Sequence, residues 1–80
     1  MNSYGLVRNR ILDLCEKKRW SHNALAGYSG IPTSTLTNII NGKSSNPGIV
    51  TIKKICDGLE ISLTDFFDTP EFRSLEQEIE

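Results

Sequence analysis

The chain has 80 residues, of which 38% are hydrophobic and 24% charged, which suits one small globular domain. No stretch approaches the ~20 apolar residues of a membrane span, and the N-terminus lacks the apolar run of a signal peptide, so we expect a cytoplasmic protein without a membrane partner. The net charge of −1 hides an asymmetry. Residues 1–54 carry eight Lys and Arg against two acids, a net charge of +6, and residues 55–80 carry one Arg against eight acids, a net charge of −7. One end of the molecule is therefore suited to a polyanion.

The first two predicted elements are short amphipathic helices. Over residues 4–18, apolar residues recur at spacings of three and four, the pattern of a helix with one buried side: Leu6, Val7, Ile11, Leu14 and Cys15. A second helix begins after Ser21, a good N-cap, and ends at Gly30, which we expect to adopt the left-handed conformation that closes a helix. Trp20, between them, is expected to fill a gap in the core.

The next helix, over about 33–41, has two different sides. It starts at Pro32 and Thr33 and stops at Asn41-Gly42. Its apolar stripe consists of Leu36, Ile39 and Ile40. The opposite side carries hydroxyls and amides in place of charges: Ser34, Thr37, Asn38 and Asn41, with Thr33 at the leading end. Such a face is too neutral for an ordinary solvated helix and too polar for a core.

The remainder of the chain is also predicted to be helical. Residues 43–48 form a loop by composition, and a helix at about 49–59 should turn one stripe inward: Ile49, Ile52, Ile55, Cys56 and Leu59. Ser62 and Asp65 resemble a capping box that opens a short helix bearing Leu63, Phe66 and Phe67. Thr69-Pro70 opens a last segment with the stripe Phe72, Leu75 and Ile79. We predict an all-α fold, with a compact five-helix bundle over 1–68 and a short helical tail over 69–80.

The helix between Ser21 and Gly30 and the helix at about 33–41, joined by a tight glycine turn, describe a helix-turn-helix. The apolar stripe would anchor the second helix, and its opposite face would stand out at a width that fits a DNA major groove. An Asn amide can pair with adenine, and a Thr methyl can touch the methyl of thymine. The polar face therefore predicts a reader of bases. The alternative for Ser34, Thr37 and Asn38 is a simply solvated surface.

Two stretches carry a resemblance to a known family: SHNALAGYSGIPTSTLTNIINGK (21–43) and NPGIVTIKKICDGLEISLTDFF (46–67). Their shared positions are Leu25-Ala26, Gly30, Gly42-Lys43, Pro47 and Ile61-Ser62-Leu63. Over residues 6–67 the chain resembles the Cro and phage-repressor (XRE-type) helix-turn-helix family. The resemblance implies a lambda-repressor-like fold and a sequence-specific DNA-binding transcriptional regulator, with repression as the favoured direction and double-stranded DNA as the partner.

Carried over position by position, the resemblance implies two sets of DNA contacts. The base-reading residues are Thr33, Ser34, Thr37 and Asn38, with Thr37 near bases or backbone. The phosphate-binding residues are His22, Lys43, Ser44, Ser45 and Asn46. This fits the general affinity of helix N-termini and backbone amides for phosphate. His22 takes the place of the family's usual glutamine, and the alternative for it is an exposed surface residue without a phosphate contact.

One departure concerns an ion pair. Many members pair an Arg late in the first helix with a Glu near the end of the recognition helix, and here these positions hold Cys15 and Ile40. Replacing both partners of a buried pair by apolar residues is often neutral or stabilising, so the double change fits the alignment. The segment 33–41 has no Arg or Lys, which leaves other cations as candidates for further positive charge toward DNA: Arg8, Arg10, Lys17, Lys18 and Arg19.

The acidic C-terminal third predicts a homodimer. It carries more apolar surface than one short helix can hide, and a domain of this size gains little stability from its core alone. Small helix-turn-helix proteins also read paired half-sites, which a two-fold dimer matches. The predicted interface consists of Phe66, Phe67, Phe72, Leu75 and Ile79, so the segment 69–80 is a candidate dimerisation element. The alternative for the stripe Phe72, Leu75 and Ile79 is to fold back on the core of its own chain.

Other chemistry finds little support in the sequence. Without a secretory signal, Cys15 and Cys56 are expected as two separate buried thiols, and with His22 they match no known metal spacing. We expect no metal and no cofactor. With one histidine, no nucleophile beside a base and no phosphate-cradling glycine loop, we expect no enzyme and no small-molecule substrate. The alternative is a protein–protein interaction module on a helix-turn-helix scaffold, such as an antitoxin-like or regulatory partner, which the pI of about 5.8 favours.

Overall fold

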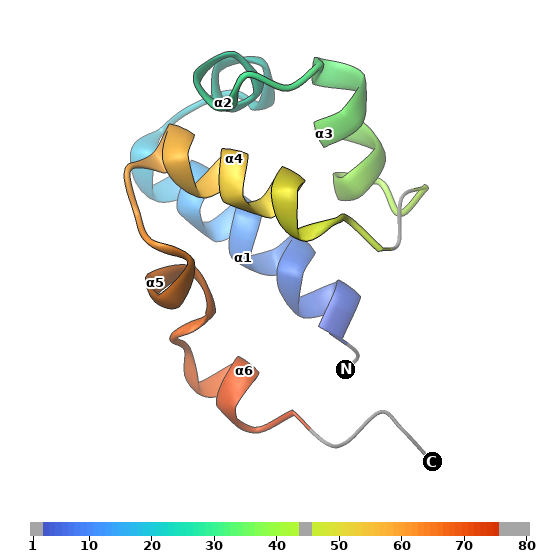
Figure 1. Cartoon of the computed structure of the whole chain (residues 1–80). Helices are drawn as coiled ribbons and strands as arrows, with labels where there is room; N and C mark the ends of the chain where they lie inside the picture. Colours follow the sequence, from blue (N-terminus) through green and yellow to red (C-terminus); the bar gives the residue numbers. More distant parts are fainter. Residues whose placement is uncertain (1–2, 44–45, 76–80) are drawn as a thin grey trace.

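Helices make up the regular structure of the chain. The structure is a computed structural model that describes residues 3–43 and 46–75 (Figure 1). Its helices are α1 (Ser3–Lys18), α2 (His22–Ser29), α3 (Thr33–Ile40), α4 (Ile49–Leu59), α5 (Leu63–Phe67) and α6 (Pro70–Arg73). The described ranges contain no strand, and the predicted all-α fold is confirmed.

Local hydrogen bonds set the helix boundaries that the sequence predicted. The Ser21 hydroxyl accepts from the N–H of Ala24 at 3.1 Å, and the Ser62 hydroxyl accepts from the N–H of Asp65 at 2.9 Å. Each satisfies a backbone donor that the first turn of a helix leaves without an intrahelical partner. Gly30 closes α2 in the left-handed conformation, with φ of 67°. This turn directs the chain from α2 into α3.

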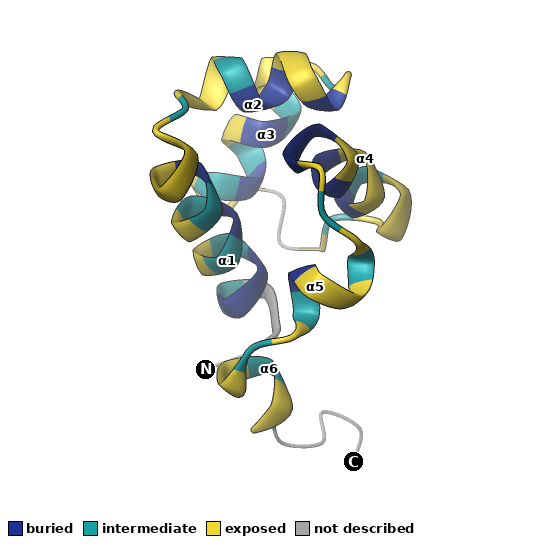
Figure 2. Cartoon of the chain, turned by 90° about the vertical axis from the view of Figure 1, so that its left-hand side faces the viewer, coloured by how far each residue is buried: buried dark blue, intermediate teal, exposed yellow. Residues whose placement is uncertain are grey.

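The core forms where the apolar stripes of the helices meet. Figure 2 shows the buried sides of α1, α2 and α4 turned toward the centre of the molecule. The largest fully buried side chains are Phe66, Ile11, Leu25, Leu36, Ile39, Ile55, Leu59 and Cys56. α2 packs most extensively on α4, and α3 packs on α2 and α1. The helix-turn-helix is therefore held from two sides.

α1 lies between the two ends of the molecule. α3 and the residues that follow it lie on one side of α1, and α6 lies on the other (Figure 1). The packing of α1 against both α3 and α6 agrees with this arrangement. The acidic C-terminal elements are thus kept away from the polar face of α3.

Both cysteines are buried, as the sequence predicted, at 3% exposure for Cys15 and 0% for Cys56, and neither forms a disulfide. Burial raises the pKa of both thiols, because an apolar environment disfavours the thiolate. The neighbouring Asp57 raises the pKa of Cys56 further. These thiols act as small core residues.

Three features differ from the sequence-based predictions. Ile49, predicted to face inward, is 60% exposed, because it occupies the first turn of α4 beside an open hollow and not beneath another helix. The last helix is shorter than its apolar stripe suggested, since α6 ends at Arg73. Trp20 is half-buried against the core, and it also stacks on the exposed ring of Tyr28 with centroids 4.5 Å apart.

Candidate nucleic-acid interface

The two sides of α3 have the division that the sequence predicted. Leu36 and Ile39 are buried beneath the helix at 0% and 1% exposure. On the opposite side Thr33, Ser34 and Thr37 are exposed, while Asn38 is half-buried: these are the four predicted base-reading residues. The buried pair anchors the helix and leaves its polar side at the surface.

The polar side chains of this face are available for contacts outside the protomer. Within the part of the chain that the structure describes, the side chains of Thr33, Ser34, Thr37 and Asn38 engage in no hydrogen bond. Pro32 precedes the helix and supplies no side-chain cap, so the first N–H groups of α3 also point outward uncapped. A face rich in donors and acceptors that the fold itself does not use can bind polar edges of a ligand.

Three of the predicted phosphate-binding residues are described, one at a helix start and two on the connection between α3 and α4. His22 is the exposed first residue of α2, beside the capping Ser21, and Lys43 and Asn46 are exposed on the connection from α3 to α4. The N–H of Lys43 donates to Oδ1 of Asn41 at 3.3 Å, which fixes the first step of that connection. Ser44 and Ser45, also predicted here, lie outside the described residues.

Two of the arginines considered as charge toward DNA serve inside the protein. Nε of Arg8 donates to the carbonyl of Ile40, the last residue of α3. Arg10 donates to the carbonyls of Phe66 and Asp65 at 2.8 and 2.9 Å, and lies 3.7 Å from the Asp13 carboxylate. Neither arginine is a free surface cation. Sequence reasoning missed both roles, because the bonds span 32 and 56 residues of chain.

Comparison with known proteins identifies the domain. A family model of the Cro/C1-type HTH DNA-binding domain matches residues 10–71. The chain belongs to the Cro/C1-type helix-turn-helix family. The resemblance found from the sequence motifs is confirmed.

Relatives of this Cro/C1-type domain are known in Bacillus subtilis (strain 168). The HTH-type transcriptional regulator SlrR is 40% identical over 60 residues, which cover 74% of this chain and 40% of SlrR. The HTH-type transcriptional repressor RghR is 36% identical over 61 residues, covering 76% of this chain and 43% of RghR. The chain thus spans less than half the length of either relative.

A solved structure has the same fold. The crystal structure of prophage Lp1 protein 11 superposes with a TM-score of 0.80 at 31% sequence identity. The match covers 92% of this chain and 97% of that one. The Cro/C1-type fold therefore includes the elements after the helix-turn-helix.

The predicted dimer residues of this Cro/C1-type domain fall into different environments. Phe66 is fully buried in the core of its own chain, so its ring has no surface to offer a second copy. Phe67, Phe72 and Leu75 are half-buried, and Ile79 lies outside the described residues. The rings of Phe66 and Phe67 contact each other edge to face with centroids 4.9 Å apart, so the half-buried Phe67 packs against the buried Phe66.

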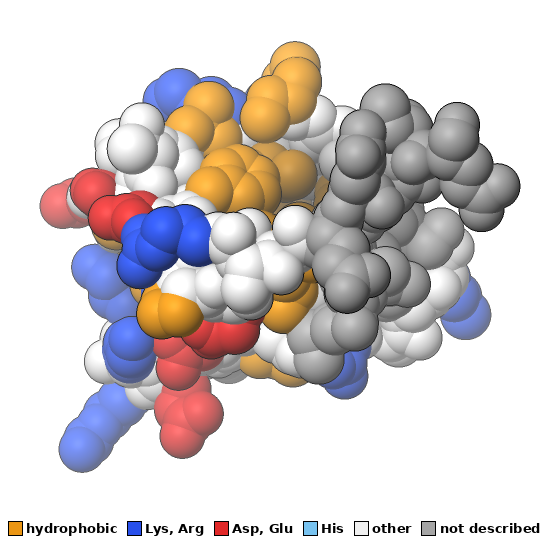
Figure 3. Space-filling model, turned by 90° about the horizontal axis from the view of Figure 1, so that it is seen from below, with side chains coloured by type: hydrophobic (Ala, Val, Ile, Leu, Met, Phe, Trp, Pro, Cys, Tyr) orange, Lys and Arg blue, Asp and Glu red, His pale blue; other side chains and the backbone are white. Residues whose placement is uncertain are grey.

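Sequence reasoning overlooked the most exposed apolar residues on α4. Ile49 is 60% exposed and Val50 is 66% exposed, and an open hollow beside them is lined by Ile49, Leu63, Thr64, Phe67 and Asp68. Figure 3, which views the molecule from below, shows hydrophobic side chains gathered at the surface with acidic side chains beside them. The sequence held no clear signal, since adjacent apolar residues on one helix can both be buried, as Leu25 and Ala26 are.

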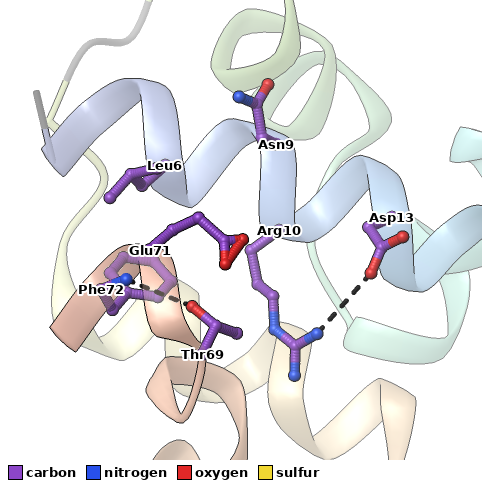
Figure 4. Close-up of a pocket in the computed structure, with 7 residues that line it drawn as sticks. All are labelled: Leu6, Asn9, Arg10, Asp13, Thr69, Glu71 and Phe72. Carbon is purple, nitrogen blue, oxygen red and sulfur yellow. Dashed lines mark hydrogen bonds and ion pairs between the residues drawn. The ribbon is translucent and has the colours of Figure 1, made fainter. Parts of the chain in front are cut away.

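A second pocket lies between α1 and α6, away from α3. Figure 4 shows Arg10 and Glu71 extending into it and the Arg10–Asp13 ion pair along its edge. Among the residues that the structure describes, no group of three or more His, Cys, Asp or Glu could hold a metal ion. In the same residues, no helix has the length and apolar content to cross a membrane.

Proposed function

We propose that this protein is a sequence-specific DNA-binding transcriptional regulator that acts as a repressor and reads the major groove with α3. The observation that carries the proposal is the polar side of α3 in a Cro/C1-type domain. Thr33, Ser34 and Thr37 are exposed and uncharged, and within the described residues their side chains make no hydrogen bond. Hydroxyl and amide groups in such a position suit the donor and acceptor pattern of base edges.

The phosphate contacts follow from helix ends and loop residues. The N-terminus of α2 offers backbone N–H groups and a positive dipole end near His22, and Lys43 offers a charge that no ion pair within the described residues engages. Asn46 is exposed on the same connection as Lys43. These contacts would orient α3 in the groove, while the residues of α3 would read the sequence.

We propose that the protein acts as a homodimer through α5, the segment after it, and the first turn of α4. The exposed side chains of Ile49 and Val50 stand next to the hollow lined by Leu63 and Phe67. A two-fold interface pairs the same patch on both copies, so the exposed side chain of Val50 of each copy would meet the hollow of the other. Two recognition helices about 34 Å apart would then match half-sites one helical turn apart. Phe66 is omitted from this interface because it is buried.

Selection of bound sites from random duplex DNA tests the proposal directly. We expect enrichment of a two-fold symmetric site, bound more tightly than scrambled duplex and less tightly as salt concentration rises. A promoter carrying the selected site should then be silenced when the protein is expressed. Absence of enrichment, together with absence of salt-sensitive DNA binding, would contradict the proposal.

The second candidate is a protein-interaction module on the same scaffold. The pI of about 5.8 and the exposed side chains of Ile49 and Val50 on α4 favour it. Such a module would form complexes with a protein partner and show no salt-dependent affinity for duplex DNA. The relative named RghR is a transcriptional repressor, which supports the DNA-binding proposal over this one.

A further inference from the structure

Arg8 connects the first helix to the end of the recognition helix. Its Nε lies 2.5 Å from the carbonyl oxygen of Ile40, and its Nη1 lies 3.2 Å from Oδ1 of Asn9. Arg8 is half-buried, so the bond to Ile40 is partly shielded from water. This hydrogen bond joins residues that are 32 positions apart in the chain.

The carbonyl that accepts this bond belongs to the last residue of α3. The last four carbonyls of a helix lack an intrahelical donor, and α3 ends at Ile40. A guanidinium at a helix C-terminus supplies a donor and a positive charge at the negative end of the helix dipole. The chain then turns through Asn41 and Gly42, which has φ of 88°, to Lys43. Arg8 therefore holds the point where α3 passes into the loop proposed to bind phosphate.

The same contact compensates for the missing ion pair. Cys15 and Ile40 occupy the positions at which many family members pair Arg with Glu, and Cys15 is buried at 3% exposure. No side-chain charge pair can join α1 to α3 there. Arg8 makes the connection through the main chain of Ile40 instead, from a position two turns earlier in α1.

We infer that Arg8 is a positioning residue for DNA reading: it holds the C-terminal end of α3 against α1 without itself binding DNA. The inference rests on the proposed function, since it assumes that α3 reads bases. Loss of the bond frees the last turn of α3 and the start of the loop. DNA binding would then have to order the last turn of α3 and the start of the loop. This entropic cost lowers the affinity for sites at which α3 makes base contacts.

Arg10 provides a matched control on the same helix. It too donates from a guanidinium to helix-terminal carbonyls, those of Asp65 and Phe66 at the end of α5. Removing its side-chain donors should loosen α5, which lies away from α3, and leave the recognition helix in place (Figure 1). Arg8→Gln and Arg10→Gln therefore remove the same charge and guanidinium bonds to different helix ends. Arg10→Gln also loses the contact with Asp13, which makes it the stricter control for general loss of stability.

The experiment measures the binding of wild type, Arg8→Gln and Arg10→Gln to a half-site duplex, so that dimerisation does not enter. The half-site comes from selection on wild-type protein, and titrations are made on it and on scrambled duplex at several salt concentrations. We expect Arg8→Gln to bind the half-site about tenfold more weakly and scrambled DNA nearly as wild type does, with an unchanged log–log salt slope. Arg10→Gln should bind both duplexes as wild type does.

Two binding results would overturn the inference. If Arg8→Gln weakens binding to both duplexes and lowers the salt slope by roughly 0.9, Arg8 is a phosphate contact. If Arg8→Gln and Arg10→Gln reduce half-site binding equally, the effect is general loss of stability. Arg8→Lys retains a charged donor, should recover part of the half-site affinity, and guards against a Gln variant that fails to fold.

Amide hydrogen exchange without DNA separates failure of the inference from failure of the proposed function. In Arg8→Gln the amides of Ile40, Asn41 and Lys43 should exchange faster than in wild type, while those of α5 should not. In Arg10→Gln the amides of α5 should exchange faster than in wild type, while those at the end of α3 should not. Unchanged exchange at the end of α3 would overturn the contact itself. Wild-type protein that selects no DNA site would overturn the proposed function, and the exchange result would still stand.

Discussion

Gly58 and Ser29 meet where α4 crosses α2, at a distance that leaves no room for a side chain on Gly58. A Cβ atom there would lie 2.5 Å from Oγ of Ser29, 2.9 Å from its backbone N and 3.0 Å from its Cα. Rotation of the serine side chain could relieve only the first of these contacts. The small residue at Gly58 thus allows the close packing that supports the first helix of the helix-turn-helix.

Gly58→Ala should destabilise the fold, even though alanine favours helices. Forcing a methyl group into a packed contact costs about 1–3 kcal/mol, more than the gain of about 0.5–1 kcal/mol from replacing a helical glycine. Gly27→Ala is the control, because Gly27 lies in α2 with nothing within 4 Å of its Cβ position and should therefore stabilise. Chemical denaturation measures both variants. If Gly58→Ala and Gly27→Ala change the free energy of unfolding equally, α2 and α4 are not closely packed at Gly58.

Ser29→Ala should leave stability unchanged or raise it by about 1 kcal/mol. Ser29 is 7% exposed, and its hydroxyl has no hydrogen-bond partner among the described residues. Removing a buried polar atom without a partner removes its desolvation cost. The double variant Ser29→Ala/Gly58→Ala should recover only part of the stability lost in Gly58→Ala, since the backbone contacts at 2.9 and 3.0 Å persist. A clear loss of stability in Ser29→Ala would indicate that its hydroxyl is hydrogen-bonded.

The sequence predicted the features that depend on a few neighbouring residues. Ser21 and Gly30 mark the two ends of α2 as predicted, because a cap bond or a left-handed turn depends on residues within one helical turn. The two faces of α3 followed from spacing alone. The left-handed conformation of Glu60 at the end of α4, with φ of 59°, was not predicted, because glycine is the usual residue at such a position.

Features decided by packing between distant segments could not be predicted from the sequence. Ile49 shares the buried stripe of α4 but extends to where the neighbouring helices leave a hollow. Phe66 belongs to the core and Phe67 does not, a choice made by the angle at which α5 packs. From the sequence, Arg8 and Arg10 were candidate surface cations. In the fold each donates to the main chain at the end of a helix that is distant in the sequence. For the same reason, the DNA contacts of the candidate site are still predictions.

Ile40→Glu should destabilise the domain by about 1–3 kcal/mol, because it places a carboxylate at a half-buried position against the core, where Arg8 already donates to the Ile40 carbonyl and offsets only part of the cost. Adding Cys15→Arg should recover much of that loss if the two positions are in contact, since the family's ion pair would be restored. Denaturation of the wild type, both single variants and the double variant forms a double-mutant cycle. Additive effects would show that Cys15 and Ile40 do not touch, and the alignment at these two positions would need revision.

Val50→Asp should convert the proposed dimer to a monomer. The substitution places a charge in the exposed apolar surface, where it would be buried unpaired in the dimer. An aspartate in the first turn of α4 suits the helix dipole, so the fold itself should not suffer. Tyr28→Lys is the control, because Tyr28 is equally exposed at 65% but lies in the last turn of α2, where a cation suits the helix dipole. Sedimentation equilibrium measures the mass. A monomeric wild type, both free and on DNA, would contradict the dimer.

Asn38 and Lys43 allow the reading of bases to be separated from the binding of backbone. Asn38 is half-buried on the polar side of α3, where its amide could pair with an adenine edge, and Lys43 is exposed past the helix end. Asn38→Ala should cost about 1–3 kcal/mol on the selected site and little on scrambled DNA. Lys43→Ala should weaken both complexes alike and lower the log–log salt slope by roughly 0.9, the release of one counterion fewer.

Titrations at several salt concentrations measure the affinity of each of the two variants for the selected and for the scrambled duplex. The selection should also be repeated with Asn38→Ala, because loss of one base contact should relax the preference at one base pair of each half-site and leave the others intact. Equal weakening of the two duplexes by Asn38→Ala would mean that α3 does not read bases through that amide. If neither variant changes DNA binding, the polar side of α3 is not the DNA-reading face, and the interaction module becomes the better account of this domain.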